Sequence, residues 1–381
     1  MGKNLNRVLI TGGAGFIGSN LALNLIEKGY IVTVLDNLSE QVHGNDPINT
    51  SHLYNKIKGK VNFILGSVNN RSDWEKAILN QDAIIHLAAE TGTGQSMYQI
   101  QKYTDVNIGG TATMLDILTN NKHTIKKLIT ASSRAVYGEG KYECLEHGVV
   151  YPMTRKEEDL SQGIFECKCP ICNGKVTLLP TSENSEINPS SIYGITKFTQ
   201  EQMALTVGES LKIPTIALRF QNVYGPGQSL TNPYTGILSI FSTRIKNGKD
   251  INIFEDGLES RDFVYIDDIV DSINICLETN KGSYQAYNVG ADKPISVIEV
   301  AETLKKEYNS DIKIYVSGNY RLGDIRHNYA DLSAIKLLGY SPKIKFKQGI
   351  SLFCNWVNSQ NICADKYDDS IKEMKEKGLY K

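Results

Sequence analysis

The hydrophobic pattern of the chain alternates between strand-like and helix-like segments. Residues 16–28 repeat apolar positions at helical spacing. Short apolar runs suited to buried strands cover residues 7–10, 31–35, 61–65, 83–87 and 127–131. This alternation predicts an α/β fold with a doubly wound, Rossmann-like parallel sheet, in which ligands bind at the carboxyl ends of the strands.

A glycine-rich turn, residues 11–18, joins the first predicted strand to the first helix. Glycines at such a turn allow a tight bend and a close approach of the backbone to a pyrophosphate, while the helix N-terminus favours the anion. The turn therefore predicts a dinucleotide site. Its candidate cofactor contacts are Gly12, Gly15, Phe16, Ile17 and Gly18.

The end of the second strand indicates which dinucleotide is bound. Asp36 lies 18 residues after Gly18, close to the spacing of about 20 residues for the ribose-binding carboxylate. A carboxylate accepts hydrogen bonds from a ribose 2′-hydroxyl but repels a 2′-phosphate, and residues 37–39 offer no cation. NAD is thus expected rather than NADP, with Asp36 and Asn37 beside it.

Small residues follow the fourth strand and let the backbone lie near the cofactor. We expect Leu87, Ala88, Ala89 and, in the next helix, Asn107 to contact NAD, and we interpret His86 as a packed strand-end residue. The loop 90–97 is either a substrate-facing segment, with Gln95 and Ser96 as contacts, or a plain connection.

Acid–base chemistry is suggested by a serine and a Tyr/Lys pair. Ser133 follows the fifth strand, and Tyr193 and Lys197 are four residues apart, on one face of a predicted helix. A nearby ammonium favours the phenolate, so we expect Lys197 to lower the pKa of Tyr193, and a positively charged nicotinamide to act in the same direction. Tyr193 could then take a proton from a substrate hydroxyl as hydride leaves the same carbon, with Ser133 bonded to that oxygen.

The motifs TGGAGFIG, HLAA, SSRAVYG and YGITK together resemble the extended short-chain dehydrogenase/reductase family, in its branch of nucleotide-sugar epimerases and dehydratases. The resemblance continues to about residue 332. It implies catalytic roles for Ser133, Tyr193 and Lys197, and contacts from Asn222, Arg261 and Arg326 to a nucleotide diphosphate. The complete set of candidate substrate contacts is Gln95, Ser96, Arg134, Asn222, Arg261 and Arg326.

The residues after the fifth strand indicate which reaction of this family branch the chain catalyses. Related 4,6-dehydratases carry Thr-Asp-Glu where this chain has Ser133-Arg134-Ala135, and alanine cannot supply the acid or base that dehydration needs. The resemblance thus implies an epimerase that inverts C4 with tightly bound NAD, most similar to the dTDP-L-rhamnose 4-epimerases that form dTDP-6-deoxy-L-talose. The alternatives are a nucleotide-sugar 4-ketoreductase, a UDP-hexose 4-epimerase and a non-enzymatic NAD(H) sensor.

Cysteines gather in an insertion at about residues 139–187. Cys169 and Cys172 form a C-x2-C knuckle that suits a structural zinc ion. Free thiols are the alternative. Four ligands are expected among Cys144, His147, Cys167, Cys169 and Cys172.

The sequence pattern predicts two units and a C-terminal tail. We predict an NAD-binding unit over 1–222 and a smaller mixed α/β substrate unit over 223–358, with a helix at 237–246 and a return to the first unit near 262–277. A charged tail at 359–381 is expected to be a solvated helix or frayed end.

The net charge of −1 and the seven unevenly spaced cysteines favour a cytoplasmic protein that binds neither nucleic acid nor membrane. Helices near 97–119 and 193–210 could pair in a homodimer.

Overall fold

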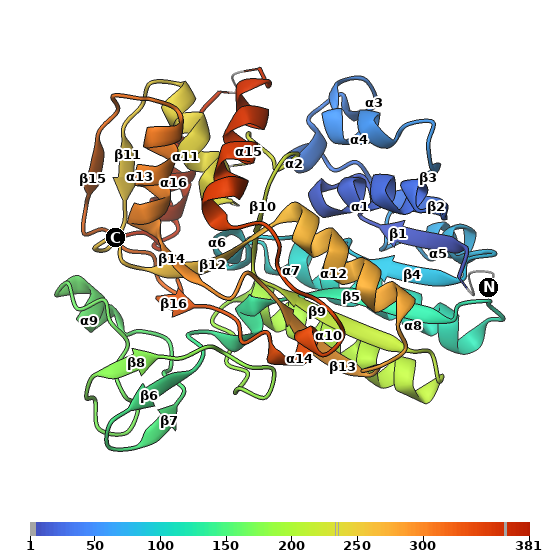
Figure 1. Cartoon of the computed structure of the whole chain (residues 1–381), viewed down its shortest axis with the longest axis horizontal. Helices are drawn as coiled ribbons and strands as arrows, with labels where there is room; N and C mark the ends of the chain where they lie inside the picture. Colours follow the sequence, from blue (N-terminus) through green and yellow to red (C-terminus); the bar gives the residue numbers. More distant parts are fainter. Residues whose placement is uncertain (1–4, 233, 235, 362–363) are drawn as a thin grey trace.

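The computed structural model describes residues 5–232, 234, 236–361 and 364–381. Its centre is a seven-stranded parallel sheet in the order β13-β9-β5-β4-β1-β2-β3 (Figure 1). The strands are β1 (Arg7–Thr11), β2 (Ile31–Asp36), β3 (Asn62–Leu65), β4 (Ala83–His86), β5 (Lys127–Ser133), β9 (Thr215–Phe220) and β13 (Gln285–Val289). The predicted doubly wound α/β class is confirmed. The strand order reverses beside β1, and such a reversal is where dinucleotides bind.

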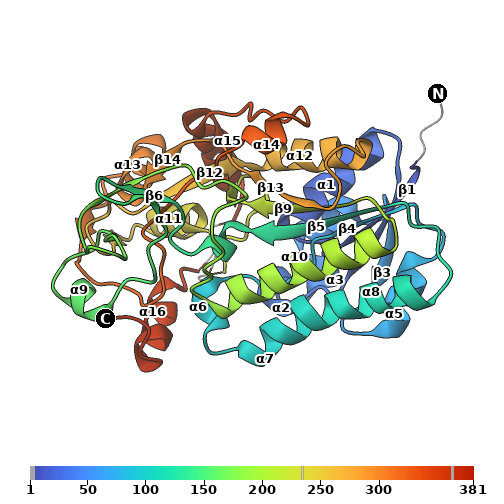
Figure 2. The ribbon, with the colours of Figure 1, turned by 90° about the horizontal axis from the view of Figure 1, so that it is seen from below.

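Helices cover both faces of this sheet, which explains why its strands are apolar on both sides. On one face lie α1 (Phe16–Glu27) and α12 (Ile266–Glu278), and on the other α5 (Arg71–Ile78), α8 (Gly110–Asn120) and α10 (Ile192–Ser210) (Figure 2). Three short helices lie between β2 and β3: α2 (Glu40–His43), α3 (Pro47–Thr50) and α4 (His52–Ile57).

The helix expected near 97–119 is present over residues 100–120, but it is not regular throughout. It consists of α7 (Ile100–Tyr103), a π-helical turn (Thr104–Gly109) and then α8, and a separate short helix, α6 (Thr93–Ser96), precedes it. Within the π turn, Asn107 exchanges two hydrogen bonds with the backbone of Glu90, through its Oδ1 at 2.8 Å and its Nδ2 at 3.1 Å. The turn thus fixes the loop that follows β4.

The second unit is built from small sheets and covering helices. Its strands are β10 (Asn222–Tyr224), β11 (Ile251–Ile253), β12 (Ser260–Tyr265), β14 (Pro294–Ser296), β15 (Ile314–Val316) and β16 (His327–Asn328). Its helices are α11 (Ile237–Lys246), α13 (Val297–Glu307), α14 (Ser333–Lys336) and α15 (Phe346–Asn358). The helix predicted at 237–246 is confirmed as α11. Between β12 and β14 the chain returns to the main sheet, where α12 packs on α1 and β13 forms the edge strand.

The cysteine-bearing insertion forms a separate lobe beside the second unit (Figure 1). After a 3-10 turn (Arg134–Tyr137) it contains β6 (Tyr142–Cys144), β7 (Gly148–Val150), α9 (Glu157–Ser161) and β8 (Val176–Leu178). The strands form an antiparallel sheet in the order β7-β6-β8.

The C-terminal segment contains a helix, as one of the two expected alternatives had it, and this helix is docked rather than frayed. Helix α16 (Tyr367–Glu376) buries Ser370 and Met374, and Tyr380 pairs with Arg321 in an isolated bridge. Its Glu373 also accepts a hydrogen bond from the hydroxyl of Tyr234. In the described part of the chain, no helix combines the length and the apolar character needed to cross a bilayer.

Candidate active site

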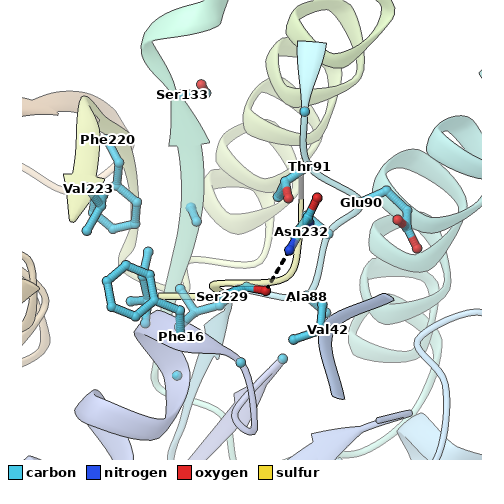
Figure 3. Close-up of a pocket in the computed structure, with 18 of the residues that line it drawn as sticks. Phe16, Val42, Ala88, Glu90, Thr91, Ser133, Phe220, Val223, Ser229 and Asn232 are labelled. Carbon is cyan, nitrogen blue, oxygen red and sulfur yellow. Dashed lines mark hydrogen bonds between the residues drawn. The ribbon is translucent and has the colours of Figure 1, made fainter. Parts of the chain in front are cut away.

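A cavity of about 520 Å³ lies between the two units at the carboxyl ends of the central strands. In Figure 3, Phe16, Phe220 and Val223 line one side, while Glu90, Thr91 and Asn232 line the other. Ser133 lies at the end of β5. The cavity therefore combines an apolar wall with a polar one, as sites for small polar ligands commonly do.

The glycine turn borders this cavity, and its geometry admits only glycine at two positions. Gly12 has φ +66°, and a Cβ there would lie 2.8 Å from the nitrogen of Ala88. A Cβ on Gly18 would lie 2.3 Å from the carbonyl oxygen of Gly12. Because α1 begins at Phe16, the amides of its first turn have no intrahelical partner and suit a pyrophosphate. All five predicted residues of this turn line the cavity: Gly12, Gly15, Phe16, Ile17 and Gly18.

Asp36 is held in position for a ribose. Its Oδ2 accepts a hydrogen bond from the amide of Ala14 at 2.9 Å, and its Oδ1 accepts one from the amide of Leu38 at 2.8 Å. His43 lies 3.9 Å from this carboxylate, but burial lowers its pKa, so that it offers no positive charge at neutral pH. The residues therefore fit NAD. Others predicted to contact it also line the cavity: Asn37, Leu87, Ala88 and Ala89.

Ser133, Tyr193 and Lys197 line the same cavity. The backbone amide of Tyr193 donates to Oγ of Ser96 at 3.1 Å, which fixes the start of α10. Burial raises the pKa of Tyr193, while its hydrogen bond with Ser133 and the charge of Arg134 act in the opposite direction. The tyrosine is therefore protonated at neutral pH in the protein alone.

Lys197 is anchored by a buried network below Tyr193. Its Nζ donates to Oε1 of Gln200, and Nε2 of Gln200 donates to Oγ1 of Thr111 at 2.9 Å. Burial lowers the pKa of Lys197 to about 7, although the charge of Glu201 opposes this. Burial therefore makes Lys197 easier to deprotonate than an ordinary lysine. The pKa of Tyr193 is raised in the protein without its cofactor, so its expected lowering by Lys197 together with a positively charged nicotinamide stays a prediction.

His86 completes this network. It bonds Thr11 through Nδ1 at 2.7 Å and Thr111 through Nε2 at 3.0 Å, and burial lowers its pKa to about 3. The prediction of a packed strand-end histidine is confirmed.

On the substrate side of the cavity, Arg134 donates from Nε to Oδ1 of Asn222 at 2.5 Å. Burial and the charge of Arg261 lower the pKa of Arg134 to about 9, so it stays charged at neutral pH. Its buried Nη1 has no hydrogen-bond partner among the described residues, nor do the side-chain amide of Gln221 and Oε1 of Gln228. Buried polar atoms are normally bonded, so these atoms suit a polar, anionic ligand.

Three predicted contacts lie outside the cavity lining and position other residues instead. Asn107 binds the backbone of Glu90 and donates to Oγ1 of Thr196 at 3.0 Å. Gln95 exchanges hydrogen bonds with the side chain of Gln41, and Ser96 holds α10. Direct contact of Asn107, Gln95 and Ser96 with a ligand stays a prediction.

The two later arginines are also outside the cavity lining. Arg261 donates to the carbonyl oxygens of residues 260, 325 and 326. Arg326 is fully buried and surrounded by carboxylates, with Nη1 3.0 Å from Glu255 and 2.7 Å from Asp256. Its charge is neutralised within the protein, which favours a structural role, and the predicted contact of Arg326 with the diphosphate stays untested.

The cavity is also lined by Thr91, from the loop 90–97 that was offered as substrate-facing, and by residues that the sequence analysis missed: Gln221, Gln228, Ser229 and Asn232. Gln221 directly precedes the predicted contact Asn222, and that adjacency was the available signal. The others lie on loops whose sequence has no strong pattern.

Of the five predicted metal ligands, the structure brings four together. The ligand atoms of Cys144, His147, Cys169 and Cys172 all lie within 4.8 Å of one another. Cys167 is not part of this cluster, and its thiol lies beside Glu139 and Tyr142. This cluster lies in the insertion and does not line the cavity.

Comparison with known proteins identifies the class. A family model described as the NAD dependent epimerase/dehydratase family matches residues 8–155 and 172–290. The chain therefore belongs to this family, and the resemblance to extended short-chain dehydrogenase/reductases of the nucleotide-sugar epimerase branch is confirmed.

Particular relatives give a closer view. The chain is 34% identical over 355 residues to the dTDP-L-rhamnose 4-epimerase of Burkholderia thailandensis, covering 92% of this chain and 94% of that protein. Among solved structures, the UDP-glucose 4-epimerase of Thermotoga maritima with UDP-glucose has a TM-score of 0.74 and 27% identity, covering 92% of this chain and 98% of that one. The UDP-glucuronic acid 4-epimerase of Bacillus cereus, in complex with UDP-glucuronic acid and NAD, has a TM-score of 0.71 and 26% identity, covering 92% and 99%.

Proposed function

We propose that the chain is an NAD-dependent nucleotide-sugar 4-epimerase that works through a transient 4-keto intermediate. The observation that carries this proposal is that one cavity is lined by the glycine turn, Asp36, Ser133, Tyr193 and Lys197. An acid–base tyrosine is thereby combined with the features of a dinucleotide site. A sensor that only bound NAD(H) would have no use for this tyrosine.

NAD, when bound, would accept a hydride from C4 of the sugar. After the 4-keto sugar has rotated, the reduced cofactor would return the hydride to C4. Tyr193 takes the proton of the C4 hydroxyl as the C4–H bond breaks, and Ser133 hydrogen-bonds to the same oxygen. Because burial raises the pKa of Tyr193, it needs nearby positive charge to ionise. Arg134, Lys197 and the oxidised nicotinamide provide that charge. Tyr193 returns the proton when C4 is reduced from its other face.

The diphosphate keeps the 4-keto sugar tethered while it rotates. Arg134 and Asn222 hold this part of the substrate, because the unpaired Nη1 of Arg134 is a donor suited to a phosphate oxygen. Ala135 lacks an acid or base for dehydration. The sugar therefore keeps all its oxygens and changes only at C4.

The substrate we propose is dTDP-L-rhamnose, in exchange with dTDP-6-deoxy-L-talose. The 34% identity to the Burkholderia protein over 92% of the chain supports it. A UDP-hexose is the second candidate, since the neighbouring solved structures are UDP-sugar epimerases. Proton NMR of dTDP-, UDP- and GDP-sugars with the isolated enzyme and no added cofactor distinguishes them. Inversion at C4 of dTDP-L-rhamnose supports the proposal, whereas conversion that requires added NADPH would indicate a 4-ketoreductase.

A homodimer through the α7, α8 and α10 face is part of this proposal. These helices lie side by side on one face (Figure 2), and Ile100 and Ile195 there are 50% and 46% exposed. Light scattering of wild type and of the Ile195→Glu variant tests it, because a charge in an apolar interface should give a monomer.

A further inference from the structure

The insertion places three thiols and one imidazole around a single point. The Sγ atom of Cys144 is 3.5 Å from Nδ1 of His147 and 3.8 Å from Sγ of Cys172, and Sγ of Cys169 is 3.7 Å from Nδ1 of His147. Tetrahedral zinc with Zn–S near 2.3 Å and Zn–N near 2.0 Å separates its ligand atoms by roughly 3.5–3.8 Å. We propose that Cys144, His147, Cys169 and Cys172 bind one structural zinc ion, independently of the sugar chemistry.

Two turns present these ligands in pairs. Cys144 and His147 lie on the turn from β6 to β7, which closes at Gly148 with φ +65°. Cys169 and Cys172 lie on a second turn, in which the amide of Gly174 donates to Sγ of Cys172 at 3.4 Å. The antiparallel pairing of Cys144 with Val176 joins the two turns. Backbone hydrogen bonds therefore preform the site before any ion is bound.

The geometry of the cluster and the small core around it favour a bound metal ion over a disulfide. A disulfide needs sulfurs about 2.05 Å apart, and the Sγ atoms of Cys144 and Cys172 are 3.8 Å apart. The core of the lobe is also small, with five buried residues: Tyr142, Cys144, Val150, Cys167 and Cys169. A core of this size stabilises a lobe weakly, and a bound zinc ion supplies the missing folding energy.

The zinc ion connects to the substrate unit through the segment beside it. Glu166, three residues before the ligand Cys169, pairs with the guanidinium of Arg326 and lies 3.1 Å from Nε2 of His327. Arg155 donates to the carbonyl oxygen of Asp324 at 2.8 Å. The insertion thus clamps residues 324–327, and we expect loss of zinc to loosen this contact as well as the lobe.

The test uses full-length protein without an affinity tag, analysed for metal by mass spectrometry. About one zinc per chain is expected. Cys172→Ser should lose the zinc and lower the melting temperature by roughly 5 °C or more, although Cys172 is exposed and makes little packing contact. The exposed His147→Ala is a second such variant. Cys167→Ser is the matched control, because it lies in the same lobe outside the cluster and should keep its zinc.

Cobalt exchange gives a second readout. Cobalt in the wild-type protein should show thiolate charge-transfer bands and the visible bands of tetrahedral coordination, and Cys172→Ser should lose them. Wild-type protein that contains no metal and has the same melting temperature as protein loaded with zinc would overturn the proposal. Zinc retained by Cys172→Ser, or an intact mass that shows a disulfide in the lobe, would overturn it too.

Discussion

The Nε atom of Arg134 lies 2.5 Å from Oδ1 of Asn222, and this hydrogen bond joins the end of β5 to the start of β10 beside the cavity. One side of the guanidinium is fixed by the bond, while the buried Nη1 lacks a partner among the described residues. This arrangement orients a charged donor before substrate arrives, so that binding costs little side-chain entropy.

Arg134→Gln should therefore weaken substrate binding. Loss of a charge-assisted hydrogen bond costs about 1.5–3 kcal/mol, which corresponds to a KM for the nucleotide sugar roughly 10- to 150-fold higher. Bound NAD per chain should stay the same. Arg71→Gln, at an exposed ion pair, is the control, and a KM for Arg134→Gln equal to that of the control would contradict the role.

Asp36→Asn should reduce the selectivity for NAD. The amide keeps part of the local hydrogen bonding to Ala14 and Leu38 but loses the negative charge that repels a 2′-phosphate. We expect NAD to bind roughly tenfold more weakly and the ratio of the NAD and NADP dissociation constants to move toward one. Fluorescence titration of both cofactors measures this, with the exposed Asp46→Asn as control. An unchanged ratio would show that Asp36 does not face the ribose.

Lys197→Met should abolish turnover yet stabilise the fold. The pKa of Lys197 is about 7 in the folded protein and about 10.4 in the unfolded chain. Between these values the unfolded chain binds more protons, so this lysine makes stability rise with pH from 7 to 10. Removing it should raise stability by roughly 1–4 kcal/mol at pH 7 and by much less near pH 10.

Lys127→Met is the matched control. Lys127 is also buried, with a pKa lowered to about 8, and its Nζ donates to the carbonyl oxygen of Thr279 outside the cavity lining. Urea unfolding at several pH values should show the same trend in this variant, with activity retained. A change in the free energy of unfolding by Lys197→Met that is the same at every pH would contradict the lowered pKa of Lys197.

Arg326→Gln separates a structural from a substrate-binding role. Its guanidinium is buried among Glu166, Glu255 and Asp256, and removing one partner of a buried ionic network typically costs about 3–5 kcal/mol. Denaturant unfolding should show a loss of this size, with a smaller rise in KM than for Arg134→Gln. A large rise in KM at unchanged stability would support Arg326 as a diphosphate ligand.

Local sequence patterns were sufficient to predict part of the fold and of the site. The apolar runs of β1 to β5 and the glycine turn are signals within a few residues, as is the four-residue spacing of Tyr193 and Lys197 on one helix face. Each depends on its own neighbourhood, so the sequence alone predicted them.

Other features depend on residues far away along the chain. The partners of Arg326 come from the insertion and from the segment after β11, and no local pattern shows that they neutralise it. Asn107 in the π turn bonds the backbone of Glu90, 17 residues away, and the C-terminal segment is docked through the contacts of Glu373 with Tyr234 and of Tyr380 with Arg321. The raised pKa of Tyr193 likewise results from burial, which spacing does not reveal.

The most direct test follows deuterium placed at C4 of dTDP-L-rhamnose. The enzyme is incubated in ordinary water without added cofactor, and the product is analysed by NMR and mass spectrometry. We predict dTDP-6-deoxy-L-talose that keeps the deuterium at C4, with turnover reduced at least roughly 100-fold by Tyr193→Phe. Loss of the deuterium to water, or equal turnover by Tyr193→Phe, would contradict hydride transfer assisted by this tyrosine.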